Sequence, residues 1–504
     1  MAKAGQKHKG PKGTRDLYPD AVLRQRYITG AWRDVSIRHG FEEIAGPTFE
    51  HASLYAVKSG DAILGELFQA FSGKSPEEVE AVRETGRAPY ALRPEFTPTL
   101  ARMYAAHAQQ LPEPCKWFTA GPYFRAERPQ RGRLREFQQW NIDMLADDGT
   151  EDGRARADAE VLGTAIELCR FLGLRGGDYA AKISHRGAVA AWLTERGIDE
   201  DKHEAVMGLL DAAGKLQIET IEKRLGQLGI DPKFAGYMKA GMPPVVKVGP
   251  QGSEKIAVFK QVTPLWKTLI VQGLIGQVEF DLSVVRGLAY YTGTVFELVA
   301  EGERAICGGG RYDSLIELFG GPATPAVGFG MGDVVLGLLL DEKGLIPEGD
   351  ELADAVSRPP ASVRPEVFCI SADDEKTDPY VMRLVTDLRR GVESAEHGQD
   401  AKPWSARRYE DRAGGVRPMH ARQSYKSTRN LKKLLADAQR QGSRLVAVVH
   451  GMDRVELRDL DGRRQLTPED VPGMPSSEAE FSVNPQSPVF VGRAAVRVLG
   501  HAHA

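Results

Sequence analysis

The order of hydrophobic and polar positions along the chain predicts an α+β protein. Apolar residues recur at helical spacing from Asp20, an expected N-cap, to Gly40, an expected helix stop. The segments "CKWFTAGPYFRAE" and "LREFQQWNIDML" are strand-like and are separated by an arginine-rich loop. We therefore expect an antiparallel hairpin that ends near Asp143.

Changes in this pattern divide the chain into domains. In the middle of the chain most apolar residues recur at helical spacing, and strand-like, glycine-rich segments follow. A proline-rich and acidic stretch precedes two short apolar strands that alternate with amphipathic helices, which is typical of a small α/β domain. The predicted parts are a first domain in two segments, 1–176 and 275–343, a helical insertion, 177–274, a linker, 344–364, an α/β domain, 365–470, and a tail, 471–504.

Composition excludes several classes of protein. A chain of 504 residues is too long for one ordinary core and suggests roughly two to four domains. The four cysteines lie far apart, without a Cys/His cluster, so we expect neither a resident metal nor a disulfide framework. The basic leader lacks an apolar core, and no run of about eighteen apolar residues occurs. We expect a protein of the cytoplasm that does not enter the membrane.

The stretch "FRAERPQRGRLREFQQWNID" combines five arginines with three acids. If the strand has no bulge, alternation places on one face the residues Arg133, Arg135, Phe137, Gln139, Asn141 and Asp143. A guanidinium group can donate two parallel hydrogen bonds to the oxygens of one phosphate, and the ring of Phe137 is suited to stacking on a base. A phosphate-bearing aromatic ligand beside a smaller polar one fits this face. A solvated basic hairpin is the alternative that these residues alone leave open.

Several motifs in the same order as in one known family add to this picture. The chain resembles the histidyl-tRNA synthetases, which are class II aminoacyl-tRNA synthetases, over most of 12–340 and more weakly over 365–470. "FEEIAGPTFE" resembles their motif 1, with Pro47 at a dimer interface, and "GPYFRAERPQRGRLREFQQWNID" resembles motif 2. "LRPEFTPTLARM" is similar to the segment that receives the amino acid. "VVRGLAYYTGTVFEL" and "CGGGRYDSLIELFGG" resemble two signatures of the histidine enzymes.

The resemblance implies a fold and a nucleotide site. The fold is an antiparallel sheet flanked by helices, with a helical insertion and a C-terminal α/β anticodon-binding domain, in a homodimer. Arg125 then holds the α-phosphate of ATP, with Mg²⁺ on the outer phosphates. Glu127 approaches the adenine amino group, Arg133 contacts the outer phosphates, and Phe137 stacks on adenine. Arg286 stabilises charge at the α-phosphate as the histidine carboxylate attacks, in line with a reaction that depends on well-placed cations.

The resemblance also implies a histidine pocket. Residues that match those binding the amino acid are Glu95, Thr97, Gln139, Asp143, Arg286, Tyr290 and Tyr291. Of these, Asp143 and Tyr291 match the pair that reads the two imidazole nitrogens. Backbone at Gly308, Gly309 and Gly310, together with Arg311, is a further candidate wall of the pocket, although a glycine run is equally typical of a turn.

Three positions depart from the family pattern. Val335 stands where motif 3 normally has an arginine that covers adenine and reaches the γ-phosphate. Asp143 replaces a common glutamate, and Ala289 replaces the aspartate before the tyrosine pair. Neither of the last two changes removes the residues that read imidazole.

The C-terminal domain is basic, with twelve Lys or Arg against three Asp or Glu from Ala401 to His450. Such an excess concentrates nucleic acid by neutralising phosphates, and an unpaired base can stack on a tyrosine. The predicted tRNA-binding residues are Tyr425, Lys426, Arg429, Lys432 and Lys433. A solvated basic helix face is the alternative for each of them.

The predicted function is therefore that of a histidine–tRNA ligase, which activates L-histidine with ATP and transfers it to the 3′ end of tRNA(His). A non-catalytic paralogue, such as the regulatory subunit of ATP phosphoribosyltransferase, is the main alternative, since the motif 3 arginine is replaced. A plain RNA-binding protein with a decayed site is the third. Retention of Arg125, Glu127 and Arg286, together with the basic C-terminal domain, favours the enzyme.

Overall fold

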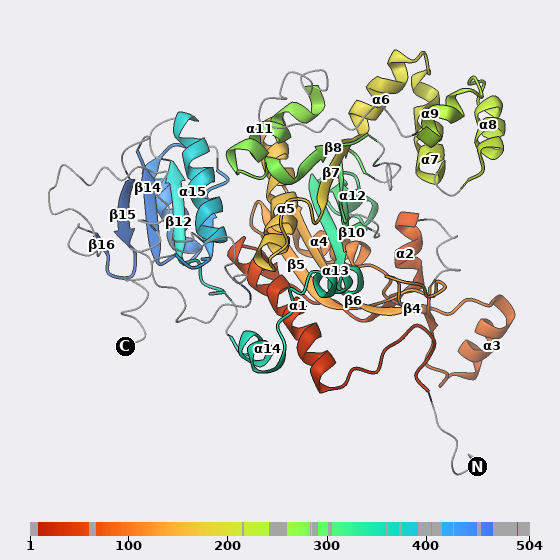
Figure 1. Cartoon of the computed structure of the whole chain (residues 1–504), viewed down its shortest axis with the longest axis horizontal. Helices are drawn as coiled ribbons and strands as arrows, with labels where there is room; N and C mark the ends of the chain where they lie inside the picture. Colours follow the sequence, from red (N-terminus) through yellow and green to blue (C-terminus); the bar gives the residue numbers. More distant parts are fainter. Residues whose placement is uncertain are drawn as a thin grey trace, which may run out of the picture.

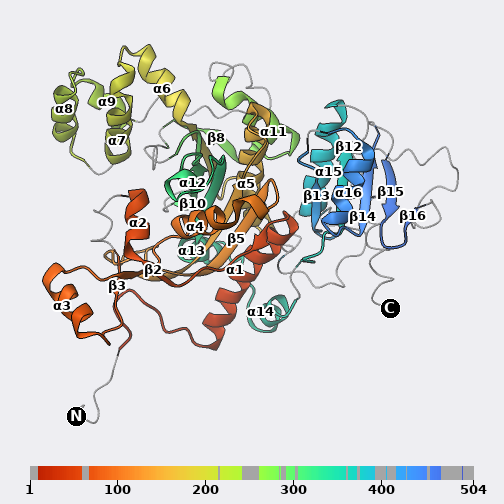
Figure 2. The same ribbon diagram turned by 180° about the vertical axis from the view of Figure 1, so that it is seen from behind.

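The computed structural model gives the arrangement of the chain (Figures 1 and 2). The described residues are 9–59, 67–213, 216–240, 260–282, 284, 291–300, 305–358, 361–371, 375–391, 405, 416–426, 428–450, 455–466 and 491. Arg286, Ala289 and Tyr290 therefore lie outside the described residues, as does most of the predicted tail.

A sheet of eight strands forms the centre of the first domain, in the order β1-β5-β6-β11-β10-β9-β7-β8. In this order, adjacent strands from β5 to β7 pair antiparallel. The two edge strands pair parallel with their neighbours, β1 with β5 and β8 with β7. The strands are β1 (Glu42–Glu43), β5 (Cys115–Phe124), β6 (Glu136–Leu145), β7 (Ala180–His185), β8 (Val278–Phe280), β9 (Thr294–Val299), β10 (Ala305–Arg311) and β11 (Ala326–Gly332). The predicted hairpin is confirmed as β5 and β6.

Helices cover both faces of this sheet, and strand alternation on β6 decides which side chains each face receives. Trp140, Ile142 and Met144 pack in the larger core beneath α1 (Pro19–Arg38) and α5 (Glu151–Phe171). Trp140 stacks on Trp32 of α1 with ring centroids 6.2 Å apart. On the other face, α4 (Thr97–His107) and α12 (Leu315–Leu318) enclose a smaller core. The odd-numbered residues of β6 point to that second side.

Two boundaries at the start of the chain are set by local chemistry. The first helix begins at Pro19 with Tyr18 as its N-cap, so the predicted N-cap at Asp20 is wrong. Pro19 suits the first turn because its missing N–H has no partner there. Gly40, with φ +77°, ends the segment as predicted.

Among the described residues, four helices lie apart from the sheet (Figure 1): α6 (Arg186–Glu195), α7 (His203–Ala213), α8 (Ile218–Gln227) and α9 (Phe234–Ala240). The predicted bounds of the insertion, 177–274, are too wide, because β7 belongs to the central sheet and α11 (Thr263–Val271) packs against α5.

The first domain also contains β2 (Phe49–His51), α2 (Ala52–Ser59), β3 (Gln69–Ala70), α3 (Pro76–Thr85), β4 (Tyr90–Leu92) and α13 (Asp333–Glu342). Of these, β2, β4 and β3 form a small antiparallel sheet. The 3₁₀ helices are η2 (Ala108–Gln110), η3 (Glu200–Lys202), η4 (Lys260–Val262), η5 (Ile275–Gln277) and η6 (Glu375–Thr377).

The predicted linker contains a packed helix. Within 344–364, α14 (Gly349–Val356) lies against α1 and buries Leu352, so this part of the predicted linker is helical and packed on the first domain. The apolar residues of α14 fall on one side, which gives it a face to bury.

In its described residues, the C-terminal domain has five strands with a helix on each face. Its strands are β12 (Val367–Ser371), β13 (Ala421–Gln423), β14 (Leu445–Val449), β15 (Val455–Asp459) and β16 (Arg464–Gln465), and its helices are α15 (Asp378–Arg390) and α16 (Leu431–Arg440). Val367 and Cys369 pack toward α15, whereas Phe368 and Ile370 pack toward α16. The predicted strands and helices of this region are confirmed. Val491, in the predicted tail, is buried in the core on the α15 side.

A buried ionic cluster joins the two domains. The Glu160 carboxylate, on α5, accepts hydrogen bonds from Arg389 Nη1 on α15 at 2.8 and 3.0 Å and from Lys116 Nζ on β5 at 2.7 Å. Burial alone would raise the pKa of Glu160, but Arg389 and Lys116 hold it well below its usual range. Burial lowers the pKa of Lys116 to about 7, although Glu160 opposes the shift. Lys116 also donates to the Tyr425 hydroxyl at 3.1 Å, so two elements of the first domain and two segments of the second meet at this cluster.

Within the part of the chain that the structure describes, no helix is both long enough and apolar enough to cross a bilayer.

Candidate functional site

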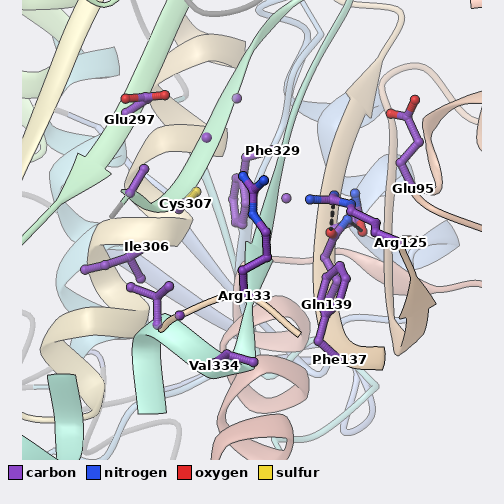
Figure 3. A pocket seen from close by; sticks show the side chains of 18 of the residues that line it. Glu95, Arg125, Arg133, Phe137, Gln139, Glu297, Ile306, Cys307, Phe329 and Val334 are labelled. Atoms are coloured by element: carbon purple, nitrogen blue, oxygen red, sulfur yellow. Dashed lines mark hydrogen bonds between the residues drawn. The ribbon is translucent and has the colours of Figure 1, made fainter. Parts of the chain in front are cut away.

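A cavity of about 1560 Å³ lies over the polar face of β6 and the neighbouring strands β11, β10 and β9 (Figure 3). Small-molecule pockets commonly have about 300–1,000 Å³, so this cavity has room for more than one ligand. Its lining residues come from the hairpin loop, from β6, from the first residues of α4 and α13, and from the glycine-rich strands.

The odd-numbered residues of β6 supply the floor of this cavity. Phe137, Gln139, Asn141 and Asp143 all line it, which confirms the predicted shared face. Arg135 does not line it, contrary to the same prediction. Its Nε instead donates to the Glu127 carbonyl oxygen at 3.1 Å, because β6 begins only at Glu136 and the alternation does not extend into the loop.

Arg125, at the end of β5, points into the cavity beside Gln139 (Figure 3). Its Nε donates to the Pro94 carbonyl oxygen at 3.1 Å and its Nη2 donates to Gln139 Oε1 at 3.3 Å. The guanidinium carbon lies 5.0 Å from the centroid of the Phe137 ring. Burial lowers the pKa of Arg125 and nearby Glu95 opposes the shift, but a guanidinium remains charged near neutral pH. The hydrogen bonds to the neutral carbonyl and amide orient this cation without neutralising it.

Arg133 and Glu127 face each other across the hairpin loop. The Arg133 guanidinium donates to the Glu127 carboxylate, and both side chains line the cavity. Their exposed fractions of 36% and 30% make this an ion pair in contact with solvent, and such pairs contribute about 0–1 kcal/mol. A phosphate can therefore compete for Arg133 at little cost. The loop also carries Arg128 into the cavity lining.

Asp143 lies at the other end of β6. The Tyr312 hydroxyl donates a hydrogen bond to its Oδ1, and both residues line the cavity. Asp143 is paired with Gly328 across the β6–β11 ladder, and a Cβ added at Gly328 would overlap the same carboxylate oxygen. Only glycine leaves room for Asp143 there. A carboxylate has about four lone-pair positions, so Asp143 can accept further bonds from a ligand.

Tyr312 is the functional candidate that the sequence prediction missed. It follows directly after β10, in the segment "CGGGRYD", in which only the glycines and Arg311 were singled out. The available signal was its position at the end of a glycine-rich strand, where a side chain can reach a site past residues that have none. Its contact with Asp143 spans 169 positions in the sequence and follows only from the sheet.

The other predicted histidine-binding residues in the described part of the chain also reach the cavity. Glu95 and Thr97 line it from the start of α4, and Tyr291 lines it from the segment before β9. Burial raises the pKa of Tyr291, and the carboxylates of Glu95 and Asp143 act in the same direction, so its hydroxyl stays protonated.

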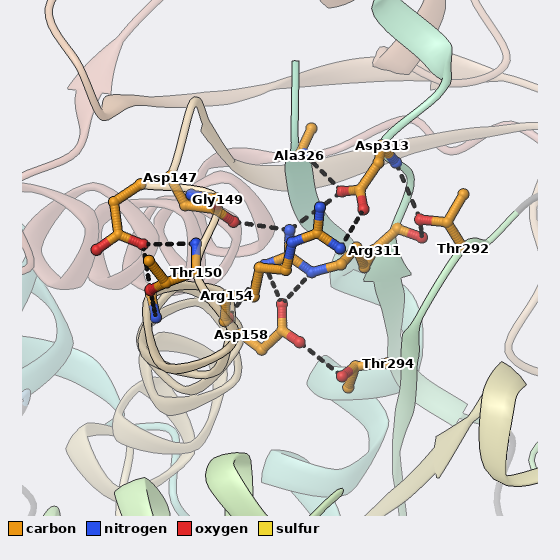
Figure 4. Close-up of polar contacts among 12 residues, drawn as sticks. Asp147, Gly149, Thr150, Arg154, Asp158, Thr292, Thr294, Arg311, Asp313 and Ala326 are labelled. Atoms are coloured by element: carbon orange, nitrogen blue, oxygen red, sulfur yellow. Dashed lines mark hydrogen bonds and ion pairs between the residues drawn. The ribbon is translucent and has the colours of Figure 1, made fainter. Parts of the chain in front are cut away.

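Arg311 does not line the cavity and lies instead among acidic side chains (Figure 4). Its Nη2 lies 2.7 Å from Asp158 Oδ1, and its Nη1 lies 2.8 Å from Asp147 and 3.1 Å from Asp313. The prediction that Arg311 walls the pocket is therefore wrong, because as the last residue of β10 it faces α5. Gly308 and Gly309 do line the cavity. Gly310 instead lies against the Tyr291 ring, where an added Cβ would come within 2.9 Å.

Comparison with known proteins identifies the family. A model described as histidyl-tRNA synthetase matches residues 13–332. This chain belongs to the histidyl-tRNA synthetase family. A histidine–tRNA ligase of Opitutus terrae is 38% identical over 352 residues, which cover 68% of this chain and 77% of the relative. The chloroplastic and mitochondrial histidine–tRNA ligase of Arabidopsis thaliana is 35% identical, with 69% of each chain covered. That of Haloarcula marismortui is 33% identical, with 76% of this chain and 86% of the relative covered.

Solved structures share the fold of this family member. The histidyl-tRNA synthetase of Nostoc sp. PCC 7120 has a TM-score of 0.51 and 21% identity, covering 92% of this chain and 96% of that one. A Bacillus halodurans protein titled as an ATP phosphoribosyltransferase regulatory subunit or histidyl-tRNA synthetase has a TM-score of 0.52 and 20% identity, covering 90% and 100%. At these identities the likeness concerns the fold alone.

The residues that the basic composition predicted to bind tRNA separate into two groups. Tyr425 packs against the core of the first domain and its hydroxyl is bonded to Lys116, which does not suit stacking on a base. The Arg429 guanidinium donates two hydrogen bonds to the Asp378 carboxylate, at 2.8 and 2.7 Å. Lys426 Nζ lies 3.1 Å from Asp437 Oδ1. The exposed candidates are Lys432 and Lys433 at the start of α16.

Proposed function

We propose that this chain is a histidine–tRNA ligase, which forms histidyl-adenylate from L-histidine and ATP and transfers the histidyl group to the 3′ end of tRNA(His). The observation that carries the proposal is one strand, β6, with Phe137 near one end and Asp143 near the other, both in the same cavity. Six residue-to-residue steps along the strand separate them by about 20 Å. A nucleotide beside the loop and an imidazole beside Asp143 fit along this strand.

The first step joins the histidine carboxylate to the α-phosphorus of ATP and releases pyrophosphate. Such reactions depend mainly on cations placed where charge develops. Arg125, buried and oriented by neutral acceptors, is suited to the α-phosphate, and Arg133 to the outer phosphates. Phe137 supplies a ring for adenine, with Glu127 nearby for its amino group. Mg²⁺ accompanies the triphosphate as part of the substrate, since it binds phosphate oxygens readily. Arg286 retains its proposed role at the α-phosphate.

Recognition of the amino acid rests on Asp143 and Tyr291, with Tyr290 proposed beside them. Tyr312 donates to Asp143 and so orients the carboxylate, which we propose as the acceptor for an imidazole N–H. Glu95, Thr97 and Gln139 are the candidates for the α-amino group. A ligand that brings no N–H donor to the Asp143 carboxylate would leave this buried group without one of its hydrogen bonds. This cost disfavours other amino acids.

The test is exchange of pyrophosphate into ATP with each amino acid in turn. Histidine alone is expected to support exchange, and only when Mg²⁺ is present. Asp143→Asn should lower kcat/KM for histidine about 10- to 100-fold, the effect of losing one hydrogen bond to a charged group. Glu204→Gln, on the exposed side of α7, is the matched control and should leave the rate unchanged. Exchange driven equally by another amino acid, or an unaltered Asp143→Asn variant, would contradict the proposal.

The relatives support the enzyme over the paralogue. Chains 33–38% identical over about seven tenths of this one are named histidine–tRNA ligases. The replaced motif 3 arginine is the observation that favoured the regulatory subunit, and the retained Arg125 outweighs it. The same exchange assay separates the two, since a regulatory subunit would not form an adenylate.

We also propose a homodimer formed around the small sheet. Phe49, Val57 and Phe71 are 56%, 47% and 46% exposed, and they lie in or next to the elements that follow Pro47. Exposed apolar side chains that gather in one region mark an interaction surface. Light scattering should give twice the monomer mass of 55.2 kDa. Phe49→Glu should shift the protein toward a monomer, whereas Val363→Glu, at a more exposed site on another surface, should not. A monomeric wild type would refute this assembly.

The remaining partners follow from the same proposal. Lys432 and Lys433 are the exposed C-terminal candidates for tRNA phosphates. Tyr425, Lys426 and Arg429 support that surface indirectly, because each is engaged within the protein. A cytoplasmic location is proposed, and four buried free cysteines are compatible with a reducing compartment.

A further inference from the structure

Asp333, the first residue of α13, has a buried carboxylate with two separate partners. Its Oδ1 accepts a hydrogen bond from the Gln138 backbone N–H at 2.9 Å. Its Oδ2 accepts one from Arg15 Nη2 at 2.7 Å. The side chain is only 4% exposed, whereas that of Arg15 is 35% exposed. A negative charge is also favourable at the first turn of a helix, because the unpaired N–H groups point toward it.

The bond to Gln138 extends the pairing of two strands. The β6–β11 ladder reaches its last pair at Gln139 and Gly332. One residue further along, the Asp333 side chain replaces a backbone carbonyl as the acceptor for Gln138. Gln138 stands between Phe137 and Gln139, which both line the cavity. The carboxylate therefore fixes the backbone from which the Phe137 ring projects.

Arg15 comes from the segment before α1, and this segment is anchored on the hairpin loop. The Gly13 carbonyl oxygen accepts the Arg135 backbone N–H at 2.8 Å. Gly13 has φ +90°, and an added Cβ would lie 2.6 Å from Pro129 Cγ and 2.9 Å from Arg135 Cγ. Only glycine allows such a close approach in this conformation. The N-terminal segment thus ties the base of the loop to the start of α13.

Neither Asp333 nor Arg15 lines the cavity, whereas the next two residues of α13, Val334 and Val335, do. The first turn of α13 therefore offers apolar side chains where motif 3 of the family has its arginine. Asp333 itself can act on a nucleotide only through the strand that it supports.

We propose that Asp333 and Arg15 are positioning residues of the nucleotide site, which hold the start of β6 so that Phe137 presents its ring to adenine. This inference rests on the proposed function, since it takes the ligand beside Phe137 to be ATP. Asp333 acts through Gln138, and Arg15 acts by keeping the Asp333 carboxylate charged and oriented. A charge-assisted bond of this kind has more orienting strength than a bond between neutral groups.

The experiment compares four variants by the dissociation constant for ATP, measured by calorimetry without turnover, and by KM in histidine-dependent pyrophosphate exchange. Asp333→Ala removes both bonds and should raise the ATP dissociation constant and the KM for ATP about tenfold, the effect of roughly one charge-assisted hydrogen bond. Asp333→Asn keeps an acceptor for Gln138 and loses the charge, so its effect should be smaller. Arg15→Gln should match Asp333→Asn, and Arg15→Lys should stay near wild type. KM for histidine should not change in any of them.

The pair can be tested for common action by the double variant Arg15→Gln/Asp333→Asn. It should be no worse than either single variant, because each removes the same ion pair. If the losses of ATP affinity are additive and Arg15→Gln causes the larger loss, Arg15 contacts the nucleotide directly. That result would overturn the positioning role. Parallel increases in both KM values with a lower Tm would also overturn it, since that is the pattern of general structural damage.

Failure of this inference is distinguishable from failure of the proposed function. Wild-type protein that binds ATP but shows no exchange with histidine would refute the function, while the series of ATP dissociation constants would still decide the role of the pair. Unchanged ATP binding in Asp333→Ala, with normal wild-type exchange, would refute the inference alone. Wild type that binds no ATP would refute both.

Discussion

Arg125→Ala should lower kcat for histidine-dependent pyrophosphate exchange by about 10²- to 10³-fold, the usual effect of removing one preorganised group that stabilises transition-state charge. Arg125 is buried in the cavity, and its bonds to the Pro94 carbonyl and to Gln139 hold it in place before any ligand binds. Its charge therefore needs no reorganisation when negative charge develops on the α-phosphate. The measurement is kcat at saturating ATP and histidine.

Two variants make the result specific. Arg125→Lys keeps the charge but loses the planar fork, so it should recover only part of the rate. Arg83→Ala, on the exposed α3 where Arg83 pairs only loosely with Glu80 at 3.5 Å, should behave as wild type. Retention of more than a tenth of the wild-type kcat by Arg125→Ala would remove Arg125 from the reaction.

Glu160→Gln should lower the free energy of unfolding by about 3–5 kcal/mol, as expected when one partner of a buried ionic group is neutralised. Glu160 is the shared acceptor of Arg389 and Lys116, and its side chain is 3% exposed. Glutamine has the same size but leaves the buried Arg389 guanidinium without its counter-charge, and it removes the charge that raises the pKa of Lys116. The measurement is urea unfolding followed by tryptophan fluorescence, with calorimetry to detect separate unfolding of the two domains.

The matched control is Glu80→Gln, which alters an exposed pair of the same residue types and should change stability by less than about 0.5 kcal/mol. Because Arg389 belongs to the C-terminal domain, that domain should separate first in Glu160→Gln. A variant as stable as wild type would show that the cluster makes no net contribution and that apolar packing alone joins the domains.

The same cluster explains why the tyrosine in the basic segment was misassigned. In the sequence, Tyr425 stands among Lys426, Arg429 and further lysines, which is typical of a nucleic-acid surface. In the structure its hydroxyl is buried beside Lys116 and Arg389, and burial raises its pKa. Local composition does not distinguish a surface that faces RNA from one that faces another domain.

The sequence by itself determined the features that depend on neighbouring residues. Alternation along β6 places Phe137, Gln139 and Asp143 on one face, because successive side chains of a strand point to opposite sides. The βα pattern of the C-terminal domain and the family motifs are equally local. The errors in these local features include Arg135, which lies outside β6, and the helix within the predicted linker.

Only the tertiary structure decided which distant side chains meet. Tyr312 reaches Asp143 because β10 and β6 lie on either side of β11, and Arg311, one residue earlier, faces α5 instead. Arg15 and Asp333 are 318 positions apart, and Lys116 and Tyr425 are 309 apart. Periodicity fixes the direction of each side chain relative to its own strand or helix. Its partner depends on the register and packing of elements far away in the chain, which no local pattern encodes.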